Sequence, residues 1–402
     1  MTTFHVSAAD LIRAGDVLLA AFRGDVEAGS AKRLGYPVTC WPVPGGIQLG
    51  AQMSGGAVSL VIPADVEGED VDEFSFPLAA IRDSKAALGK RGVRLVLDGN
   101  TFRVEAAGAT LAPPLVQGIA RQPKGEFLAP DPDRLAAFSL DTAALPWVAA
   151  ALADDDARPV LTRVHCRAAE PGADAVTLVA ADGFRLHEAA ALATVDRWDG
   201  WDSDAGRSGD AYVSLPGWLV AAIGKLRCQS VDIRAGWWQD GRHECLASWD
   251  AAVSLRASWM PVGAPPDFRV VFGSVLSEVA ECTGKMADLA DALTVLGPVA
   301  RQGANIFRVV PGDGSLALES TVAEVGTVRR DVPVTGQGLR FAANVTYWLD
   351  ALGKPKNGAA FTLAFDPRMV KADGGFSSPI RLVTEQPFGE ALSVIMPMHI
   401  AR

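Results

Sequence analysis

Acidic residues, histidines and a thiol are the first groups to test for chemistry in this 402-residue sequence. Asp154-Asp155-Asp156 offers carboxylates to a cation, but consecutive carboxylates rarely converge on one ion, so we interpret the run as a solvated loop ending a helix. His187-Glu188 lacks the second histidine of a His-Glu-x-x-His zinc helix. His243-Glu244-Cys245 is too small a set for zinc, which takes about four ligands. We predict no metal and no cofactor.

Catalytic motifs are equally scarce. The sequence contains no Walker-type Gly-x-x-x-x-Gly-Lys-[Ser/Thr] and no dinucleotide fingerprint. A hydrolase built from scattered aspartates and histidines stays open as an alternative, but no nucleophile–base pair can be named for it. Trp237-Trp238 favours packing over base stacking. We therefore predict that the protein is not an enzyme.

The C-terminal segment is the strongest candidate for binding. It reads Val394-Ile395-Met396-Pro397-Met398-His399-Ile400-Ala401-Arg402, and it is apolar where chain ends are usually polar and frayed. Methionine is flexible and polarizable, which suits a surface that accepts several partners. Pro397 fixes the backbone between the two methionines. We expect a docked strand that forms one wall of a groove.

Helices with similar beginnings recur about 130 residues apart along the sequence and would position such a groove. Residues 78–81, 218–223 and 345–352 have helical apolar spacing, and residues 10–22, 141–153 and 285–296 predict an earlier helix in each third. Short strand patterns lie between them, including a hairpin at residues 93–104 and one turning at Asp182-Gly183, a dipeptide that suits a type I′ turn. Proline-rich stretches at 122–132 and 263–266 mark boundaries. The pattern predicts an α+β unit repeated three times.

Composition places few limits on function. The formal net charge of −10 excludes a uniformly basic protein that coats nucleic acid. It does not exclude a ring-shaped protein around nucleic acid, because such a protein needs positive charge only on its inner surface. The absence of a long apolar run predicts no membrane span, and the N-terminal residues show no secretory signal pattern. The five cysteines are scattered and odd in number, which favours buried thiols in a reducing cytoplasm.

Four segments together resemble a known family. Arg158-Pro159-Val160-Leu161 precedes Ala181-Asp182-Gly183-Phe184-Arg185-Leu186, then Pro265-Pro266-Asp267-Phe268, then the C-terminal segment. In this order and spacing they resemble the bacterial DNA sliding clamp, the β subunit of DNA polymerase III. That family has Arg-x-x-Leu, Thr-Asp-Gly-His-Arg-Leu and Phe-Pro-Asp-Tyr at corresponding places and ends in Met-Pro-Met-Arg-Leu. The resemblance covers essentially the full length.

The resemblance implies a fold and a function. The fold is α+β, with three similar clamp-type domains (residues 1–125, 126–264 and 265–402), each with two helices and antiparallel sheets, in a head-to-tail homodimeric ring. The implied function is a DNA polymerase processivity factor that encircles double-stranded DNA without sequence preference. Its partners would be the replicative polymerase, the clamp loader and other proteins with a clamp-binding motif. The alternative is a clamp-like paralogue of plasmid or phage type with altered partners.

The resemblance also implies a partner-peptide groove between the second and third domains. The residues expected there are Arg158, Leu161, Ala181, Gly183, Phe184, Leu186, Pro266, Val271, Val394, Met396, Pro397 and Met398. Three positions depart from the family: Ala181 stands in place of Thr, Phe184 in place of His, and His399 in place of Arg. These departures leave the groove in place but make its peptide preference an open question.

DNA contacts are expected from basic residues on or near the helices, because a protein that slides must hold phosphates without reading bases. The candidates are Arg13, Arg23, Lys32, Arg33, Arg82, Lys85, Lys225, Arg227, Arg301, Lys354 and Lys356. Each competes with the simpler interpretation of a solvated surface charge. The helix expected before residue 154 carries no basic residue, which argues against a strongly positive lining there.

Overall fold

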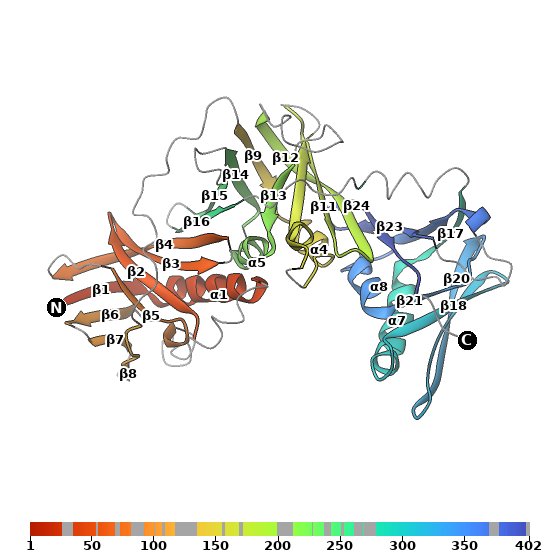
Figure 1. Cartoon of the computed structure of the whole chain (residues 1–402), viewed down its shortest axis with the longest axis horizontal. Helices are drawn as coiled ribbons and strands as arrows, with labels where there is room; N and C mark the ends of the chain where they lie inside the picture. Colours follow the sequence, from red (N-terminus) through yellow and green to blue (C-terminus); the bar gives the residue numbers. More distant parts are fainter. Residues whose placement is uncertain are drawn as a thin grey trace.

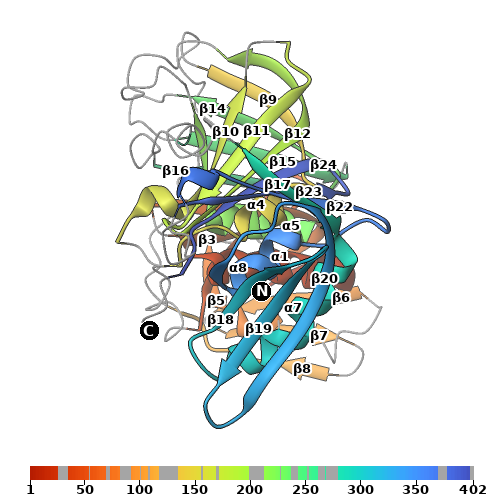
Figure 2. The same cartoon turned by 90° about the vertical axis from the view of Figure 1, so that its right-hand side faces the viewer.

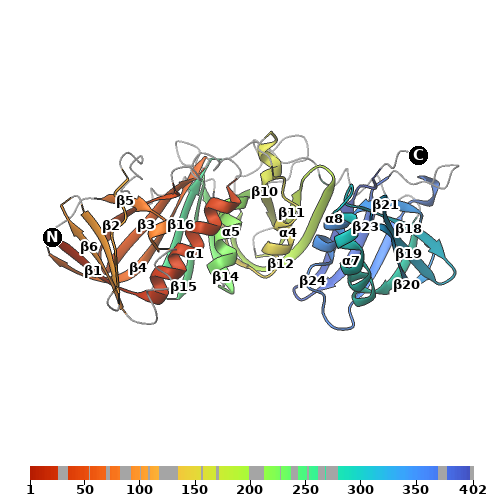
Figure 3. The same cartoon turned by 90° about the horizontal axis from the view of Figure 1, so that it is seen from below.

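The computed structural model describes residues 1–25, 35–53, 55–68, 73–81, 92–99, 101–106, 109–116, 135–154, 157–168, 172–198, 212–226, 228–236, 243–250, 253–260, 268, 279–369 and 378–398. Most of this part of the chain is antiparallel sheet, with a few helices, as expected for an α+β fold. The elements follow one another in an arc, with the helices on its concave side and the sheets outside (Figure 1). A view from below shows the same helices in front of the sheets (Figure 3).

One arrangement of strands occurs three times along the chain. Unit 1 comprises β1 (Thr2–Ser7), α1 (Ala8–Gly24), β2 (Pro37–Val43), β3 (Gly46–Met53), β4 (Gly56–Gly68), β5 (Phe74–Pro77), β6 (Gly92–Asp98), β7 (Thr101–Ala106) and β8 (Ala109–Leu111). Unit 2 comprises β9 (Leu135–Asp141), α4 (Leu145–Ala149), η1 (Pro159–Thr162), β10 (Arg163–Ala168), β11 (Ala175–Ala181), β12 (Arg185–Trp198), β13 (Val213–Pro216), α5 (Gly217–Leu226), β14 (Ser230–Gly236), β15 (His243–Asp250) and β16 (Val253–Trp259). Unit 3 comprises β17 (Ala280–Lys285), α7 (Met286–Ala300), β18 (Ile306–Gly312), β19 (Ser315–Val322), β20 (Gly326–Gly336), β21 (Phe341–Asn344), α8 (Val345–Leu352), β22 (Ala360–Phe365), η2 (Pro367–Met369), β23 (Ile380–Gln386) and β24 (Gly389–Ile395).

The pairing within each unit is the same. In unit 1, β1 pairs with β4 and β6, β2 with β3 and β5, β3 with β4, and β7 with β6 and β8. Units 2 and 3 repeat this pattern strand for strand. The fourth strand of a unit is long and belongs to two sheets. The proposed domain boundaries near residues 125 and 264 fall outside the described residues.

Two further pairings join the units. The last strand of unit 2, β16, pairs with β4, so residues 254–259 lie opposite residues 56–61. In the same way the last strand of unit 3, β24, pairs with β12, so residues 391–395 lie opposite residues 185–189. Each joint therefore continues a sheet from one unit into the next.

The helices end and begin where the sequence provides signals. In α1, Asp10 lies in the first turn and Arg23 in the last, where their charges complement the helix dipole. Helix α8 has Asn344 as N-cap, and its side chain accepts hydrogen bonds from the backbone N–H groups of Thr346 (2.9 Å) and Tyr347 (3.4 Å). This cap explains why Asn344-Val345-Thr346, which matches a glycosylation acceptor, is a helix start.

Two helix predictions need correction. The helix expected over residues 141–153 is limited to α4, Leu145–Ala149, with the Asp141 carboxylate accepting from the Ala143 N–H (2.7 Å) before it and turns after it. The chain turns away here because the Ala153 N–H bonds to the Leu161 carbonyl (3.0 Å) instead of continuing a helix. Helix α7 runs past the expected end at 296 to Ala300 and includes Pro298, which the last turn accommodates.

Other sequence expectations can be checked directly. The hairpin at residues 93–104 is confirmed as β6–β7. All five cysteines are free and buried, as predicted. In the part of the chain that the structure describes, no helix is long and apolar enough to cross a membrane. Trp237-Trp238 lies outside the described residues.

Candidate functional site

An apolar floor lies on the outer face of the sheet that joins units 2 and 3. It is a cluster of buried side chains, separate from the larger cores, and is called here the docking floor. Its members are Ala153, Leu161, Val179, Ala181, Leu186, Phe268 and Val394. The strand register explains the grouping, because Leu186 lies opposite Ala181 on one side and Val394 on the other. Side chains from three segments thus meet on one face of the sheet.

One wall of the groove is the short helix η1 and the residue before it. Pro159 begins η1, and Leu161 points into the docking floor. His165 holds this wall in place: its Nε2 bonds to the Val160 carbonyl (2.9 Å) and its Nδ1 to the Ser214 hydroxyl (2.8 Å). Burial lowers the pKa of His165 to about 4, so the ring is neutral, with Nε2–H as donor and Nδ1 as acceptor. His165 is buried, and its contact with Ser214 connects β10 to β13.

The turn between β11 and β12 closes one end of the groove. The Asp182 carboxylate accepts from the backbone N–H groups of Phe184 (2.8 Å) and Arg185 (3.0 Å). Only Gly183 has positive φ (+95°), so the positive φ expected at Asp182 in a type I′ turn is wrong, and the turn has glycine at its first central position, as in type II′. The positive φ favours glycine at this position. A Cβ on Gly183 would also lie 2.6 Å from Nη1 of Arg158, so the guanidinium would have to move.

Two apolar side chains stand at the mouth of the groove. Phe184 is 56% exposed and Met396 is 36% exposed. Their backbones are fixed, because the Met396 N–H donates to the Phe184 carbonyl (2.8 Å). Arg158 is exposed beside them and donates from Nη2 to the Asp182 carbonyl (3.0 Å). The mouth therefore combines exposed apolar surface with one exposed guanidinium.

The C-terminal segment, expected to form a wall of the groove, runs along the docking floor. Val394 is still part of β24 and lies in the docking floor. After Ile395 the chain leaves the sheet, and the Met398 N–H donates to the Ala342 carbonyl of unit 3 (2.7 Å). Pro397 and Met398 are half-buried. His399 lies outside the described residues.

Beneath the groove, polar contacts connect units 2 and 3. Trp147 of α4 donates from Nε1 to the Ala351 carbonyl of α8 (2.9 Å). The buried ring of His187 stacks on Trp147 with centroids 4.4 Å apart, and its Nδ1 bonds to the Trp147 carbonyl (2.9 Å). Burial lowers the pKa of His187 to about 3, which leaves a neutral ring with Nδ1–H as the donor. His187 therefore packs inside the joint, against Trp147.

An ionic contact crosses the same joint. Arg185 bonds through Nε to the Asp182 carboxylate (3.0 Å) and through Nη1 to Asp350 of α8 (2.5 Å). Its guanidinium also lies over the Tyr347 ring, 4.4 Å from the centroid. These partners are in α8 and in the turn, so the charge of Arg185 is directed at the joint and away from the groove.

The concave side holds a large open basin between α1, α4 and α5, with a volume of about 1150 Å³. Among the predicted DNA contacts, Arg13, Arg23 and Lys225 line it. Asp16, Asp25 and Asp154 line it too, so the positive and negative charges of this lining balance. Arg301, at the end of α7, and the two lysines after α8, Lys354 and Lys356, are exposed.

The structure brings together most of the expected groove residues that it describes. Leu161, Ala181, Leu186 and Val394 pack together in the docking floor. Beside it, Arg158 lies against Gly183 and Met396 is hydrogen-bonded to Phe184, with Pro397 and Met398 following in the chain. Pro266 and Val271 lie outside the described residues, as do Lys32, Arg33, Arg82, Lys85 and Arg227 among the DNA candidates. Sequence reasoning missed Ala153, Val179 and Phe268 as floor residues. The alternation Val179–Ala181 along β11 was the available signal for one of them.

Among the described residues, no group of three or more His, Cys, Asp and Glu could hold a metal ion. His243, from one of the tested motifs, is buried and stacks on Trp259 with centroids 5.7 Å apart. Asp154 is exposed, while the other two aspartates of its run lie outside the described residues.

Comparison with solved structures identifies the fold. No family model and no curated protein matches the sequence. A DNA polymerase III β subunit from Thermotoga maritima is similar over 100% of both chains, with a TM-score of 0.73 and 17% identity. The DNA polymerase sliding clamp of Bacillus subtilis is similar over 100% of both chains (TM-score 0.70, 16% identity). The chain therefore has the sliding-clamp fold, and the resemblance seen in the sequence is confirmed at the level of fold.

A third sliding clamp is also similar. It is the C. crescentus β sliding clamp, described as having PEG bound to a proposed β-motif tethering region, with a TM-score of 0.68 and 17% identity over 99% of this chain and 100% of that one.

Proposed function

We propose that this protein is a DNA polymerase processivity factor: a sliding clamp that encircles duplex DNA as a head-to-tail homodimer and tethers partners through the groove between units 2 and 3. Its three domains would be residues 1–125, 126–264 and 265–402. Retention on DNA would be topological and would involve no catalysis. The proposal is supported by the full-length similarity to sliding clamps and, above all, by the two unused strand edges described next.

Among the described residues, the repeated strand pairing leaves one unpaired strand edge at each end of the series of units. Twice in the chain, the last strand of one unit pairs with the first half of the fourth strand of the preceding unit. One last strand, β8, and one fourth strand, β20, have no such partner in the described chain. All three residues of β8 are exposed, and so is most of the first half of β20. The β19–β20 hairpin projects from unit 3 in two views (Figures 1 and 2).

Pairing β8 of one copy with β20 of another would form the same joint a third time. It would use the pattern already present twice, and it would cover edges that otherwise invite aggregation. Because the joint is heterologous, two copies that each offer one β8 and one β20 can close into a ring.

The groove would receive a short linear peptide with apolar anchors from the polymerase, the clamp loader or another partner. A docking floor of buried aliphatic side chains next to exposed Phe184 and Met396 fits such anchors, which concentrate binding energy in a few residues. Tethering would raise the local concentration of the polymerase at its template. The balanced charge of the basin lining accords with retention by encirclement, because a topological link needs few phosphate contacts.

Retention on circular and linear DNA tests the proposal. After loading with the host's clamp loader and ATP, the protein should stay on a nicked circle for many minutes and leave within seconds once the circle is cut. Equal retention on both forms would exclude encirclement. A pulldown with the host's replicative polymerase distinguishes the replicative clamp from a clamp-like paralogue. Retention on circles without polymerase binding would indicate a paralogue of plasmid or phage type.

The ring joint can be tested separately. Thr110→Pro places a residue without an N–H in β8, which should block pairing with β20 and convert a dimer to a monomer by light scattering. Unfolding by urea should change little, because β8 is an exposed three-residue edge strand. A dimer that persists in this variant would place the interface elsewhere.

A further inference from the structure

A second hollow lies beside the groove on the outer face of the joined sheet. It is called here the side hollow, and its volume is about 470 Å³. Strands β11, β12, β23 and β24 contribute its lining, which includes Thr177, Glu188, Leu192, Arg381, Val383 and Phe388. None of the sequence-based candidates falls among these residues.

The side hollow is continuous with the docking floor. Glu188 follows Leu186 by two residues, and Leu392 precedes Val394 by two, so each pair lies on one face of its strand. The register places Glu188 opposite Leu392, just as Leu186 lies opposite Val394. Leu392 packs against the docking floor and also lines the side hollow. The two sites are therefore about 7 Å apart along the strands, the length of two residues.

The polar groups of the side hollow are poorly matched within the chain. Nε of Arg381 is buried and has no hydrogen-bond partner. Burial raises the pKa of Glu188, while Arg167 and Arg381 act through space in the opposite direction. Glu188 and Arg381 form no direct ion pair. A buried donor without an acceptor costs free energy. Because Nε itself is covered, a ligand gains from this donor when the Arg381 side chain turns toward it.

Apolar surface completes the side hollow. Leu192 is 69% exposed, although it belongs to a strand, and Val383 and Phe388 lie on the other side. Together these features give one exposed aliphatic side chain, one unsatisfied donor and one half-buried carboxyl. A polypeptide can match all three, because its peptide group carries both an acceptor and a donor and its side chains can cover Leu192.

We propose that the side hollow binds the stretch of partner polypeptide adjoining the residues held in the groove, with a peptide or carboxamide group between Arg381 and Glu188 and an apolar side chain on Leu192. This inference rests on the proposed docking function of the groove. It makes the docking surface longer than the groove alone, so that partner segments are distinguished by residues outside their apolar anchors. The side hollow then acts as a specificity site.

Peptide selection followed by trimming tests the inference. An unbiased phage library of dodecapeptides is selected on the full-length protein, with Met396→Asp used to remove peptides that bind outside the groove. One selected peptide is synthesised at full length and trimmed from each end to the shortest core that still depends on Met396. Fluorescence polarisation then gives Kd for both peptides on the native protein, Arg381→Ala, Leu192→Ser and the control Val325→Ser, whose residue is 47% exposed on unit 3.

On the native protein and on Val325→Ser, the full-length peptide should bind about tenfold more tightly than the core, equivalent to about 1.4 kcal/mol. On Arg381→Ala and Leu192→Ser that advantage should fall to about twofold or less. Leu192→Ser keeps the test valid if Arg381→Ala folds poorly, because Leu192 is a surface residue. Equal Kd values for the core and full-length peptides would overturn the proposed role of the side hollow and leave the docking function intact. So would an affinity advantage of the full-length peptide that neither variant changes. Failure to select any Met396-dependent peptide overturns the docking function and the side hollow together.

Discussion

The two joints within this chain use the same strand pairing but differ in what lies beneath it. At the joint of units 1 and 2, apolar side chains form one continuous core that runs from β1 to β16. At the joint of units 2 and 3, the two large cores are separate except that Ala391 of β24 belongs to the first. The docking floor, hydrogen bonds and an ion pair connect these units. The docking floor lies at the second joint. Both joints continue a sheet by the same backbone pairing, and they differ in the side chains that pack beneath it.

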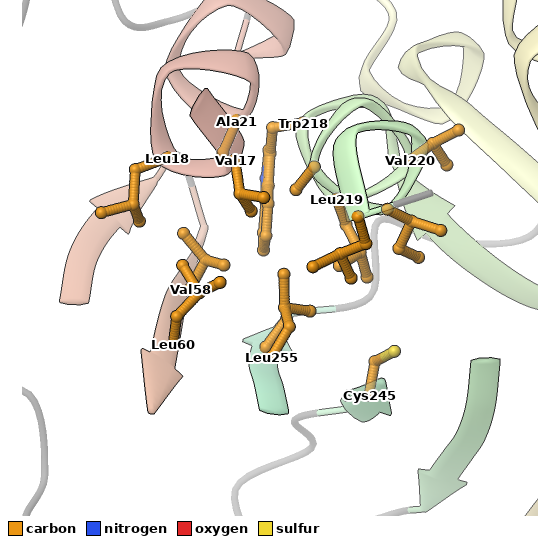
Figure 4. Close-up of a cluster of buried hydrophobic side chains, with 14 of the residues drawn as sticks. Val17, Leu18, Ala21, Val58, Leu60, Trp218, Leu219, Val220, Cys245 and Leu255 are labelled. Atoms are coloured by element: carbon orange, nitrogen blue, oxygen red, sulfur yellow. The ribbon is translucent and has the colours of Figure 1, made fainter. Parts of the chain in front are cut away.

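The first joint depends on close packing of α1 against α5. Figure 4 shows Trp218 between these helices, with Val17 and Ala21 on one side and Leu219 on the other. A Cβ on Gly24 would lie 2.9 Å from the Cβ of Ala221, so the helices approach as closely as glycine permits. The second joint has a tryptophan as well, but Trp147 hydrogen-bonds across it.

The largest expected effect is at the apolar joint. Trp218→Ala should lower the free energy of unfolding by about 3–5 kcal/mol, because it opens a cavity in a shared core. Urea unfolding followed by circular dichroism measures this. Peptide binding at the groove should not change once the protein is folded. A loss below about 1 kcal/mol would show that the two units do not share a core.

A substitution in the groove should weaken partner binding without lowering stability, the opposite of the effect expected for Trp218→Ala. Met396→Asp should weaken partner binding by about 2 kcal/mol or more, because it places a charge at an apolar hot spot, and it should leave the free energy of unfolding within about 0.5 kcal/mol, because Met396 is exposed. Polymerase stimulation and urea unfolding give the two values. Unchanged stimulation would remove this groove from the proposed mechanism.

Acid should lower the stability of the joint between units 2 and 3, where His187 is buried. Burial depresses the pKa of His187 to about 3, below its value of about 6.5 in an unfolded chain, so the unfolded state binds more protons as pH falls below about 6.5. Stability from this residue is complete above that pH and is lost progressively toward pH 3, by about 2 kcal/mol at pH 5.

Urea unfolding at pH 7.5 and 5 measures the acid effect in the native protein and in His187→Phe, which keeps a ring stacked on Trp147. The native protein should lose more stability on acidification than the variant does. His5→Gln, at a partly exposed histidine, serves as the control. An identical loss in the native protein and in His187→Phe would show that His187 does not cause the acid sensitivity.

A smaller effect is expected when only the hydrogen bond across the second joint is removed. Trp147→Phe eliminates the Nε1–H donor to the Ala351 carbonyl while keeping an aromatic ring. The free energy of unfolding should fall by about 1–2 kcal/mol. Because the bond joins the two units beneath the groove, hydrogen exchange should increase in α8 and not in α1. Increased exchange in both helices would mean that the joints are not independent.

The smallest expected effect concerns peptide preference. Phe184→His keeps a planar ring at the groove mouth and adds polar atoms, while the backbone bonds to Asp182 and Met396 remain available. Peptides with an apolar residue at this end should bind about threefold to fivefold less tightly, roughly 1 kcal/mol, and stability should not change. Equal preference for polar and apolar peptides in both proteins would show that Phe184 does not contact the peptide.

Much of the fold was predictable because local patterns and packing agree. The helical spacing of residues 78–81, 218–223 and 345–352 predicted three units, and the last two are α5 and α8. Asp98-Gly99 predicted the β6–β7 hairpin. The helix expected to reach 153 failed because tertiary bonding to the η1 segment ended it after Ala149. The type I′ prediction was wrong because Gly183 alone has a positive φ and occupies the first central position of the turn.

The sequence by itself determined the repeated α+β units, the buried free cysteines and the segments that meet at the groove, because these depend on side-chain type and on periodicity over a few residues. Only the tertiary structure decided that β12 is completed by β24, that Val179 and Phe268 join the docking floor, and that Glu188 and Arg381 face one hollow. Such groupings arise from strand register between distant segments. A shift of one residue would turn every side chain to the other face, and no local pattern fixes that choice.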